Sequence, residues 1–179
     1  MAAQVLSEAR IGNRLRVAAW SAAAGLLLLP AIAMQFTREV SWGPVDFLVA
    51  ALLIGGTGLV FELAIRARVS GVYRAGAAVA LFTTFLTIWI NLAVGMIGDE
   101  GNPLNLLFGG VIAVAVLGGF LARFQPVGMA WTMAATALVQ AATVIPALTT
   151  EPRTAALIGA FTLPWLLSAA LFRAAGRRS

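Results

Sequence analysis

The chain has 179 residues, of which 61% are hydrophobic and 11% are charged, and its formal net charge is +5. Soluble globular domains are about 45–50% apolar and about 25% charged, so this composition excludes an ordinary water-soluble domain and indicates a protein whose solvent is lipid. The sequence has no cysteine and no histidine. Their absence removes disulfides, thiolate metal sites, histidine-ligated haem, copper or zinc, and the usual proton shuttle at neutral pH.

Six apolar runs follow one another along the chain, and each is long enough for a membrane-spanning helix, which needs about 20 mostly apolar residues. They cover 17–36, 46–67, 74–97, 105–123, 127–148 and 154–173. A β-barrel is excluded because its strands would alternate apolar and polar residues over about ten positions. We therefore predict an all-α integral membrane bundle of six transmembrane helices over residues 17–173, with an N-terminal segment 1–16 and a C-terminal tail 174–179.

The placement of arginine predicts the orientation of this bundle. If the N-terminus is cytoplasmic, ten of the 12 basic residues fall on the cytoplasmic side, and only Arg38 and Arg153 fall on the other. Such an excess is the positive-inside pattern of inner-membrane proteins. We expect a bacterial inner-membrane location with both termini cytoplasmic. The lipid bilayer is the expected partner of the arginines, and no nucleic acid is needed to explain them.

Residues 1–35 also resemble a secretory signal peptide, because arginines precede an apolar stretch that contains the small-x-small triplet Ala31-Ile32-Ala33. The stretch is about 20 residues long, whereas the apolar region of a signal peptide has about 7–15. We expect these residues to be retained as the first helix.

Polar residues concentrate in the two outer loops of this topology, after the first and the third helix. The members of this outer-face cluster are Arg38, Glu39, Trp42, Asp46, Asp99, Glu100, Asn102 and Asn105. Trp42 suits a membrane-interface anchor, and Asp46 and Asn105 are expected to cap the helices that they precede. The functional alternative is a shallow cation site of carboxylates and amides, although no EF-hand spacing supports it.

Glu62 is the acid placed deepest in the predicted membrane region, which makes it a functional candidate because an unpaired carboxylate is costly there. Arg66 follows four residues later, in the favourable order for an ion pair along a helix. We favour a structural Glu62–Arg66 pair over a proton-carrying acid.

The third and fifth predicted helices each carry a polar stripe at helical spacing. The members are Thr84, Thr87 and Asn91 in the third helix, and Thr136, Gln140 and Thr143 in the fifth. Such side chains must find hydrogen-bond partners inside a bilayer. We favour an interhelical hydrogen-bond seam, and the alternative is a small polar cavity between these two helices.

No enzyme template fits the sequence. It has no HExxH motif, no GxSxG motif and no Walker loop, and a rhomboid-type dyad would lack its histidine. We expect no catalytic residue, no cofactor, no metal and no enzymatic activity. A lipid- or quinone-modifying enzyme stays open as a weaker option.

Three blocks carry a resemblance to a known group of proteins. They are MQFTREVSWGPVDF at 34–47, INLAVGMIGDEGNPLNLLF at 90–108 and ARFQPVGMAWTMAATALVQA at 122–141. Together they resemble a family of small, multi-pass bacterial inner-membrane proteins to which no activity is assigned. The resemblance implies a bacterial membrane protein and transfers no functional residue.

Two functions remain open at this point. We favour an accessory or structural membrane protein that presents its polar outer loops to a membrane-protein partner or to a second copy of itself. The alternative is a small transporter or channel subunit with a polar cavity between the third and fifth helices.

Overall fold

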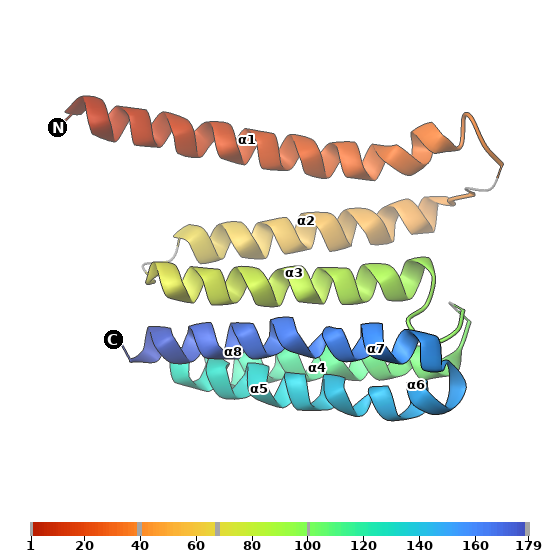
Figure 1. Cartoon of the computed structure of the whole chain (residues 1–179). Helices are drawn as coiled ribbons and strands as arrows, with labels where there is room; N and C mark the ends of the chain where they lie inside the picture. Colours follow the sequence, from red (N-terminus) through yellow and green to blue (C-terminus); the bar gives the residue numbers. More distant parts are fainter. Residues whose placement is uncertain (1, 39–40, 67–68, 100, 178–179) are drawn as a thin grey trace. The chain divides into compact units, whose positions relative to one another are not determined.

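A computed structural model describes residues 2–38, 41–66, 69–99 and 101–177, and it describes only the backbone of residues 2–15, 19, 61 and 63–66. All regular structure in these ranges is helical, as the predicted all-α class requires. In chain order the helices are α1 (Ala2–Ala33), α2 (Pro44–Arg66), α3 (Gly71–Ala93), the short 3-10 helix η1 (Pro103–Asn105), α4 (Leu106–Leu121), α5 (Pro126–Ala142), α6 (Val144–Thr150), α7 (Pro152–Ala160) and α8 (Thr162–Gly176) (Figure 1).

Five helical segments are long and apolar enough to cross a membrane: Arg16–Ala33, Gly71–Ala93, Pro103–Leu121, Pro126–Thr150 and Pro152–Gly176. The predicted run 46–67 corresponds to α2, whose apolar stretch Pro44–Val60 is shorter than these five. The helices indicate a multi-pass membrane protein with five candidate spans among the described residues, one fewer than the six expected from the sequence.

Proline explains why the last two spans are each made of two helices. α5 ends at Ala142 and α7 ends at Ala160, and each of these residues lies four positions before a proline, Pro146 and Pro164 respectively. A proline inside a helix has no N–H to donate, and its ring clashes with the carbonyl four residues earlier. The helix therefore breaks at that carbonyl, and α6 and α8 continue the two paths (Figure 1).

The chain divides into two compact units, residues 1–60 and 61–179. In the first unit, the Trp20 ring lies over Gly58, so that a Cβ added to Gly58 would lie 3.0 Å from a ring carbon. Large apolar side chains of both helices are exposed, among them Leu28 and Leu52. A helix that is apolar around its whole circumference is typical of a membrane span.

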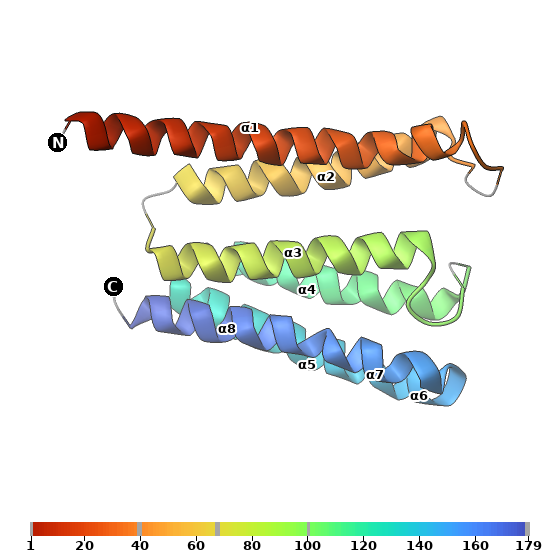
Figure 2. The same cartoon turned by 45° about the horizontal axis from the view of Figure 1, so that its top comes forward.

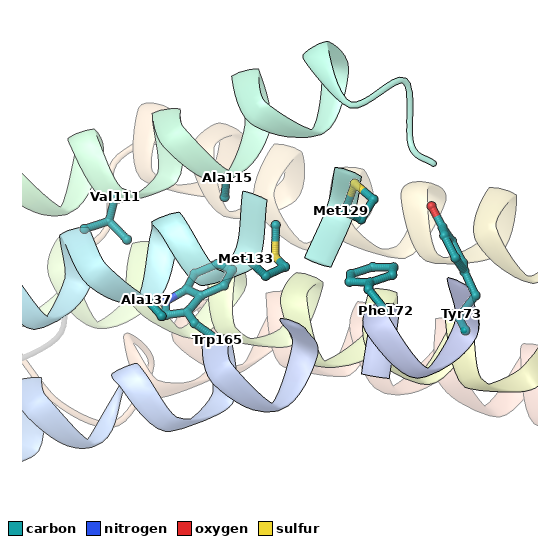
Figure 3. Close-up of a cluster of buried hydrophobic side chains, with 9 residues drawn as sticks. Tyr73, Val111, Ala115, Met129, Met133, Ala137, Trp165 and Phe172 are labelled. Carbon is teal, nitrogen blue, oxygen red and sulfur yellow. The ribbon is translucent and has the colours of Figure 1, made fainter. Parts of the chain in front are cut away.

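α8 is the central helix of the second unit. It packs along α5 and along α3, and α4 packs mainly against α5 (Figure 2). Between these helices lies a core of large side chains that includes Val111, Met133, Trp165 and Phe172 (Figure 3). The rings of Tyr73 and Phe172 form a T-shaped pair, with ring centroids 4.9 Å apart.

Two contacts define one end of the second unit. The Tyr73 hydroxyl donates a hydrogen bond of 2.7 Å to the Phe124 carbonyl, which joins the start of α3 to the turn after α4. Gly176 lies against Val127, which joins the end of α8 to the start of α5. We call this the arginine end, because it carries Arg74, Arg123, Arg173 and Arg177.

The opposite end of the second unit has its own small core, built from Met96, Ile97, Phe108, Ala147 and Ile158. These residues come from the turn between α3 and α4 and from α4, α6 and α7. The turn over residues 94–105 therefore packs against the α6–α7 corner. We call it the outer turn, after the side of the membrane on which the sequence predicts it.

Candidate functional site

The outer turn is organised around the side chain of Asn105, which is only 5% exposed. Its Oδ1 accepts hydrogen bonds from the backbone N–H of Met96 at 3.1 Å and of Ile97 at 2.9 Å. Its Nδ2 donates to the Asp99 carbonyl at 2.6 Å. One buried amide thus bonds three backbone groups, of which the Asp99 carbonyl also accepts from the Asn102 N–H at 3.2 Å, and this fixes the path of the turn.

Two glycines allow the backbone to take this path. Gly95 has a φ of +75° and Gly98 a φ of +71°, a region that residues with a Cβ rarely adopt. A Cβ on Gly95 would collide with the Asp99 carbonyl and would lie 2.8 Å from Asn105 Nδ2. Gly95 is therefore needed at its position for both its backbone conformation and its lack of a side chain.

Asn102, and not Asn105, caps the helical segment that follows. The Asn102 Oδ1 accepts from the Leu104 N–H at 3.0 Å at the start of η1, and Pro103 occupies the first helical position. Asn105 precedes α4 but makes no side-chain capping bond there. The prediction that Asn105 caps α4 is therefore wrong: its side-chain amide is bonded to the backbone of residues 96, 97 and 99 instead.

The carboxylates are the remaining polar groups of the outer-face cluster. The Asp99 side chain is exposed on the outer turn, while Glu100 and Glu39 lie outside the described residues. No group of three or more acids, histidines or cysteines that could hold a metal ion occurs among the residues that the structure describes. Asn105 would be a poor cation ligand, since its oxygen already accepts two hydrogen bonds.

The first outer loop belongs to the other unit and is described by itself. The Asp46 carboxylate accepts a 2.7 Å hydrogen bond from the Gly43 N–H, one residue before α2 begins. This is the reach-back half of a capping box, as expected for an acid in the first turn. Trp42 packs edge-on against Phe47, with centroids 5.4 Å apart, and Arg38 is exposed.

The threonines of the two polar stripes bond within their own helices. Thr87 donates to the Thr83 carbonyl at 2.8 Å, and Thr136 donates to the Thr132 carbonyl at 2.9 Å. Thr143 donates to the Gln140 carbonyl at 2.7 Å, and Thr84 is half-buried. A buried threonine hydroxyl is satisfied in this way without a partner on another helix.

Three other side chains of the described residues donate hydrogen bonds from one helical segment to another. Gln140 Nε2 donates to the Ile158 carbonyl of α7 at 3.1 Å, and Asn91 Nδ2 donates to the Asn105 carbonyl at 3.1 Å. The Ser168 hydroxyl donates to the Gly76 carbonyl at 2.9 Å and ties α8 to α3. The polar residues thus join α5 to α7, α3 to η1 and α8 to α3, and none of these bonds joins α3 to α5.

Sequence reasoning missed Ser168. It is the polar residue in the middle of the last apolar run, and it is fully buried. That position marks it as a buried donor, because a hydroxyl inside a bilayer needs an acceptor. The sequence does not tell whether the acceptor lies on the same helix or on another.

Among the side chains that the structure describes, three buried polar atoms have no hydrogen-bond partner: Asn91 Oδ1, Gln140 Oε1 and Trp165 Nε1. Trp165 of α8 lies in the core beside Ala137 of α5 (Figure 3). Ala137 is one turn before Gln140 on α5.

The predicted Glu62–Arg66 ion pair lies partly outside the described residues. Glu62 is half-buried on α2, and the side chain of Arg66 lies outside the described residues.

In comparisons with family models, with curated proteins and with solved structures, none matched this chain. The function is therefore argued from the residues and their geometry.

Proposed function

We propose that this chain is a six-span protein of the bacterial inner membrane that acts as an accessory protein and presents its outer turn to a membrane-protein partner. In this proposal α2 is the sixth span. It has 23 residues, which at about 1.5 Å per residue gives about 35 Å, enough for a hydrocarbon core of about 30 Å.

The arginines support an orientation with both termini in the cytoplasm. Arg74, Arg123, Arg173 and Arg177 gather at the arginine end of the second unit, while Arg153 follows the first residue of α7 near the outer turn. The positive-inside rule assigns the arginine-rich end to the cytoplasm. The outer turn then faces the opposite side, and Asp99 is exposed there.

The observation that carries the accessory function is the fixed conformation of the outer turn. A simple connection between two helices does not need a buried amide that bonds the backbone at residues 96, 97 and 99. A turn that is rigid before it binds loses less conformational entropy when a partner docks. The exposed Asp99 carboxylate suits a partner that offers a cationic or hydrogen-bond-donating group.

A photo-crosslinking amino acid at position 99 tests this proposal in native membranes. We expect a discrete adduct that weakens when Asn105→Ala is added, because the turn then loses its fixed path. Arg153, exposed at the α6–α7 corner, is the matched control position on the same side. The mass of the adduct tells a different protein from a second copy. No adduct at 99, or an equal adduct at 153, would count against the accessory function.

One observation favours the alternative of a small transporter or channel subunit. The unpartnered atoms of Asn91, Gln140 and Trp165 would suit a polar solute that passes between helices. Against this, Gln140 is fully buried and its amide nitrogen is bonded to the Ile158 carbonyl. An accessory protein needs no water path to either residue, whereas a transporter does.

Single cysteines at positions 91 and 140 separate the two functions, since the natural chain has none. For an accessory protein we expect neither cysteine to react with a membrane-impermeant thiol reagent, while a cysteine at position 99 reacts readily. Reaction at 140 at a rate comparable with 99 would favour transport.

A further inference from the structure

A groove of about 370 Å³ runs along the outside of the second unit between α5 and α8. Alanines from both helices line it, and we call them the alanine floor: Ala130, Ala134, Ala169 and Ala170. Small side chains on both sides leave the space open where larger residues would fill it. The groove has the size of an ordinary small-ligand site, about 300–1,000 Å³, but its floor offers only methyl groups.

The groove leads to the arginine end. α5 and α8 run antiparallel, and they are in close contact where Gly176 meets Val127, since a Cβ on Gly176 would lie 2.9 Å from Val127 Cγ2. Arg173 and Arg177 line the groove at this end, and both are exposed. In the part of the chain that the structure describes, no acidic residue lines the groove.

Trp131 lines the same groove and is 69% exposed. It lies on the first turns of α5, close to the arginine end. Tryptophan at the end of a span is typical of the membrane–water interface, where the ring lies at the level of the lipid headgroups. The two arginines and this tryptophan thus mark the headgroup level, and the alanine floor extends from there toward the middle of the bilayer.

We infer that this groove binds an anionic phospholipid, with one acyl chain along the alanine floor and its phosphate at Arg173 and Arg177. An apolar ligand with a negative end matches both parts of the groove, and basic pockets between spans bind such headgroups. Topology alone accounts for arginines at this end, but not for an apolar groove that leads to them. The inference requires α5 and α8 to lie in a bilayer, and it does not depend on a partner at the outer turn.

Native mass spectrometry of the purified full-length protein in detergent tests the inference. The protein is offered equal amounts of phosphatidylglycerol and phosphatidylcholine with the same acyl chains. An arginine near an anionic lipid contributes about fivefold in binding, so the natural protein should retain phosphatidylglycerol by about 25-fold over phosphatidylcholine. The double variant Arg173→Gln/Arg177→Gln should lose most of this preference.

Two further variants test where the lipid binds and which arginines set the preference for the anionic lipid. Ala170→Phe should reduce retention of both lipids, because the ring occupies the groove; Ala170 is exposed, so the larger side chain fits without disturbing the bundle. Arg153→Gln removes an arginine at the other end and should leave the preference unchanged. Ala170→Phe also keeps the test decisive if the double variant does not fold.

Three results of the lipid-retention measurements would overturn the inference. They are equal retention of the two lipids by the natural protein, an unchanged preference in the folded double variant, and full retention of phosphatidylglycerol by Ala170→Phe. Excess inorganic phosphate should not displace the lipid. Displacement by phosphate alone would identify the site as one for the free anion and would equally contradict a lipid site.

Discussion

Asn105 lies eight and nine residues after the backbone donors that it satisfies, Ile97 and Met96. It also holds the Asp99 carbonyl, so its short side chain closes the outer turn on itself. The Asn102 side chain accepts a local hydrogen bond from the Leu104 N–H. The side chains of the two asparagines in the turn therefore contribute different numbers of hydrogen bonds to its structure, although the residue type is the same.

Replacing Asn105 by alanine tests this difference. Two buried N–H groups would lose their acceptor, and an unsatisfied buried group costs about 1–3 kcal/mol, so we expect Asn105→Ala to lower the free energy of unfolding by about 2–4 kcal/mol. Asn102→Ala removes one cap and should cost about 1 kcal/mol. Thermal or denaturant unfolding of the purified protein in detergent measures both. Equal losses for the two variants would show that Asn105 has no special role.

The sequence predicted that this turn is rich in acids and amides, but not the role of Asn105. A helix cap is a local pattern that position alone suggests, and Asn105 does precede α4. Its actual partners depend on where the chain folds back after two glycines of positive φ. That path is a tertiary feature, and no spacing rule gives it.

The two helices α4 and α5 come into close contact at a glycine, Gly118 of α4. A Cβ on Gly118 of α4 would lie 2.6 Å from the Thr132 methyl carbon of α5. In lipid, helices gain packing from such approaches because no hydrophobic drive brings them together. Gly109 lies on the same helix, and a Cβ there would meet nothing within 4 Å.

Valine at these two glycines makes a matched pair. We expect Gly118→Val to lower the free energy of unfolding by about 1–3 kcal/mol, because the added methyl groups force α4 away from α5. Gly109→Val makes the same chemical change on the same helix in open space, and it should have little effect. The midpoint of thermal unfolding in detergent reports both. A Gly109→Val loss as large as that of Gly118→Val would mean that valine itself, and not the contact, is responsible.

Helix patterns were predicted better than helix partners. The polar stripes lie where the spacing places them, with Thr87, Thr136 and Gln140 fully buried. In place of bonds across the third and fifth helices, Thr87 and Thr136 bond the preceding turn of their own helix, the ordinary behaviour of a helical threonine. Gln140 bonds the Ile158 carbonyl of α7. The breaks at Ala142 and Ala160 follow from Pro146 and Pro164, and the proline rule could have located them.

Composition alone was sufficient for the class of the whole molecule, since a chain that is 61% hydrophobic and 11% charged cannot cover a core in water. The number of spans is harder to predict, and α2 shows why. Its apolar stretch Pro44–Val60 is followed by Glu62 before α2 ends at Arg66. Hydropathy cannot decide whether such a helix crosses the bilayer or ends within it. Residues that face lipid and residues that face another helix are equally apolar, so the pattern also leaves the packing of α1 and α2 undetermined.

The proposed six-span topology is tested most directly by single cysteines on either side of α2 and in the outer turn. Ser41, Gly71 and Asp99 are all exposed, and the natural chain contributes no competing thiol. In intact cells, we expect an impermeant thiol reagent to label Ser41→Cys and Asp99→Cys, and to label Gly71→Cys only after the membrane is permeabilised. Labelling of Ser41→Cys and Gly71→Cys from the same side would contradict the account, because α2 would then not cross the membrane.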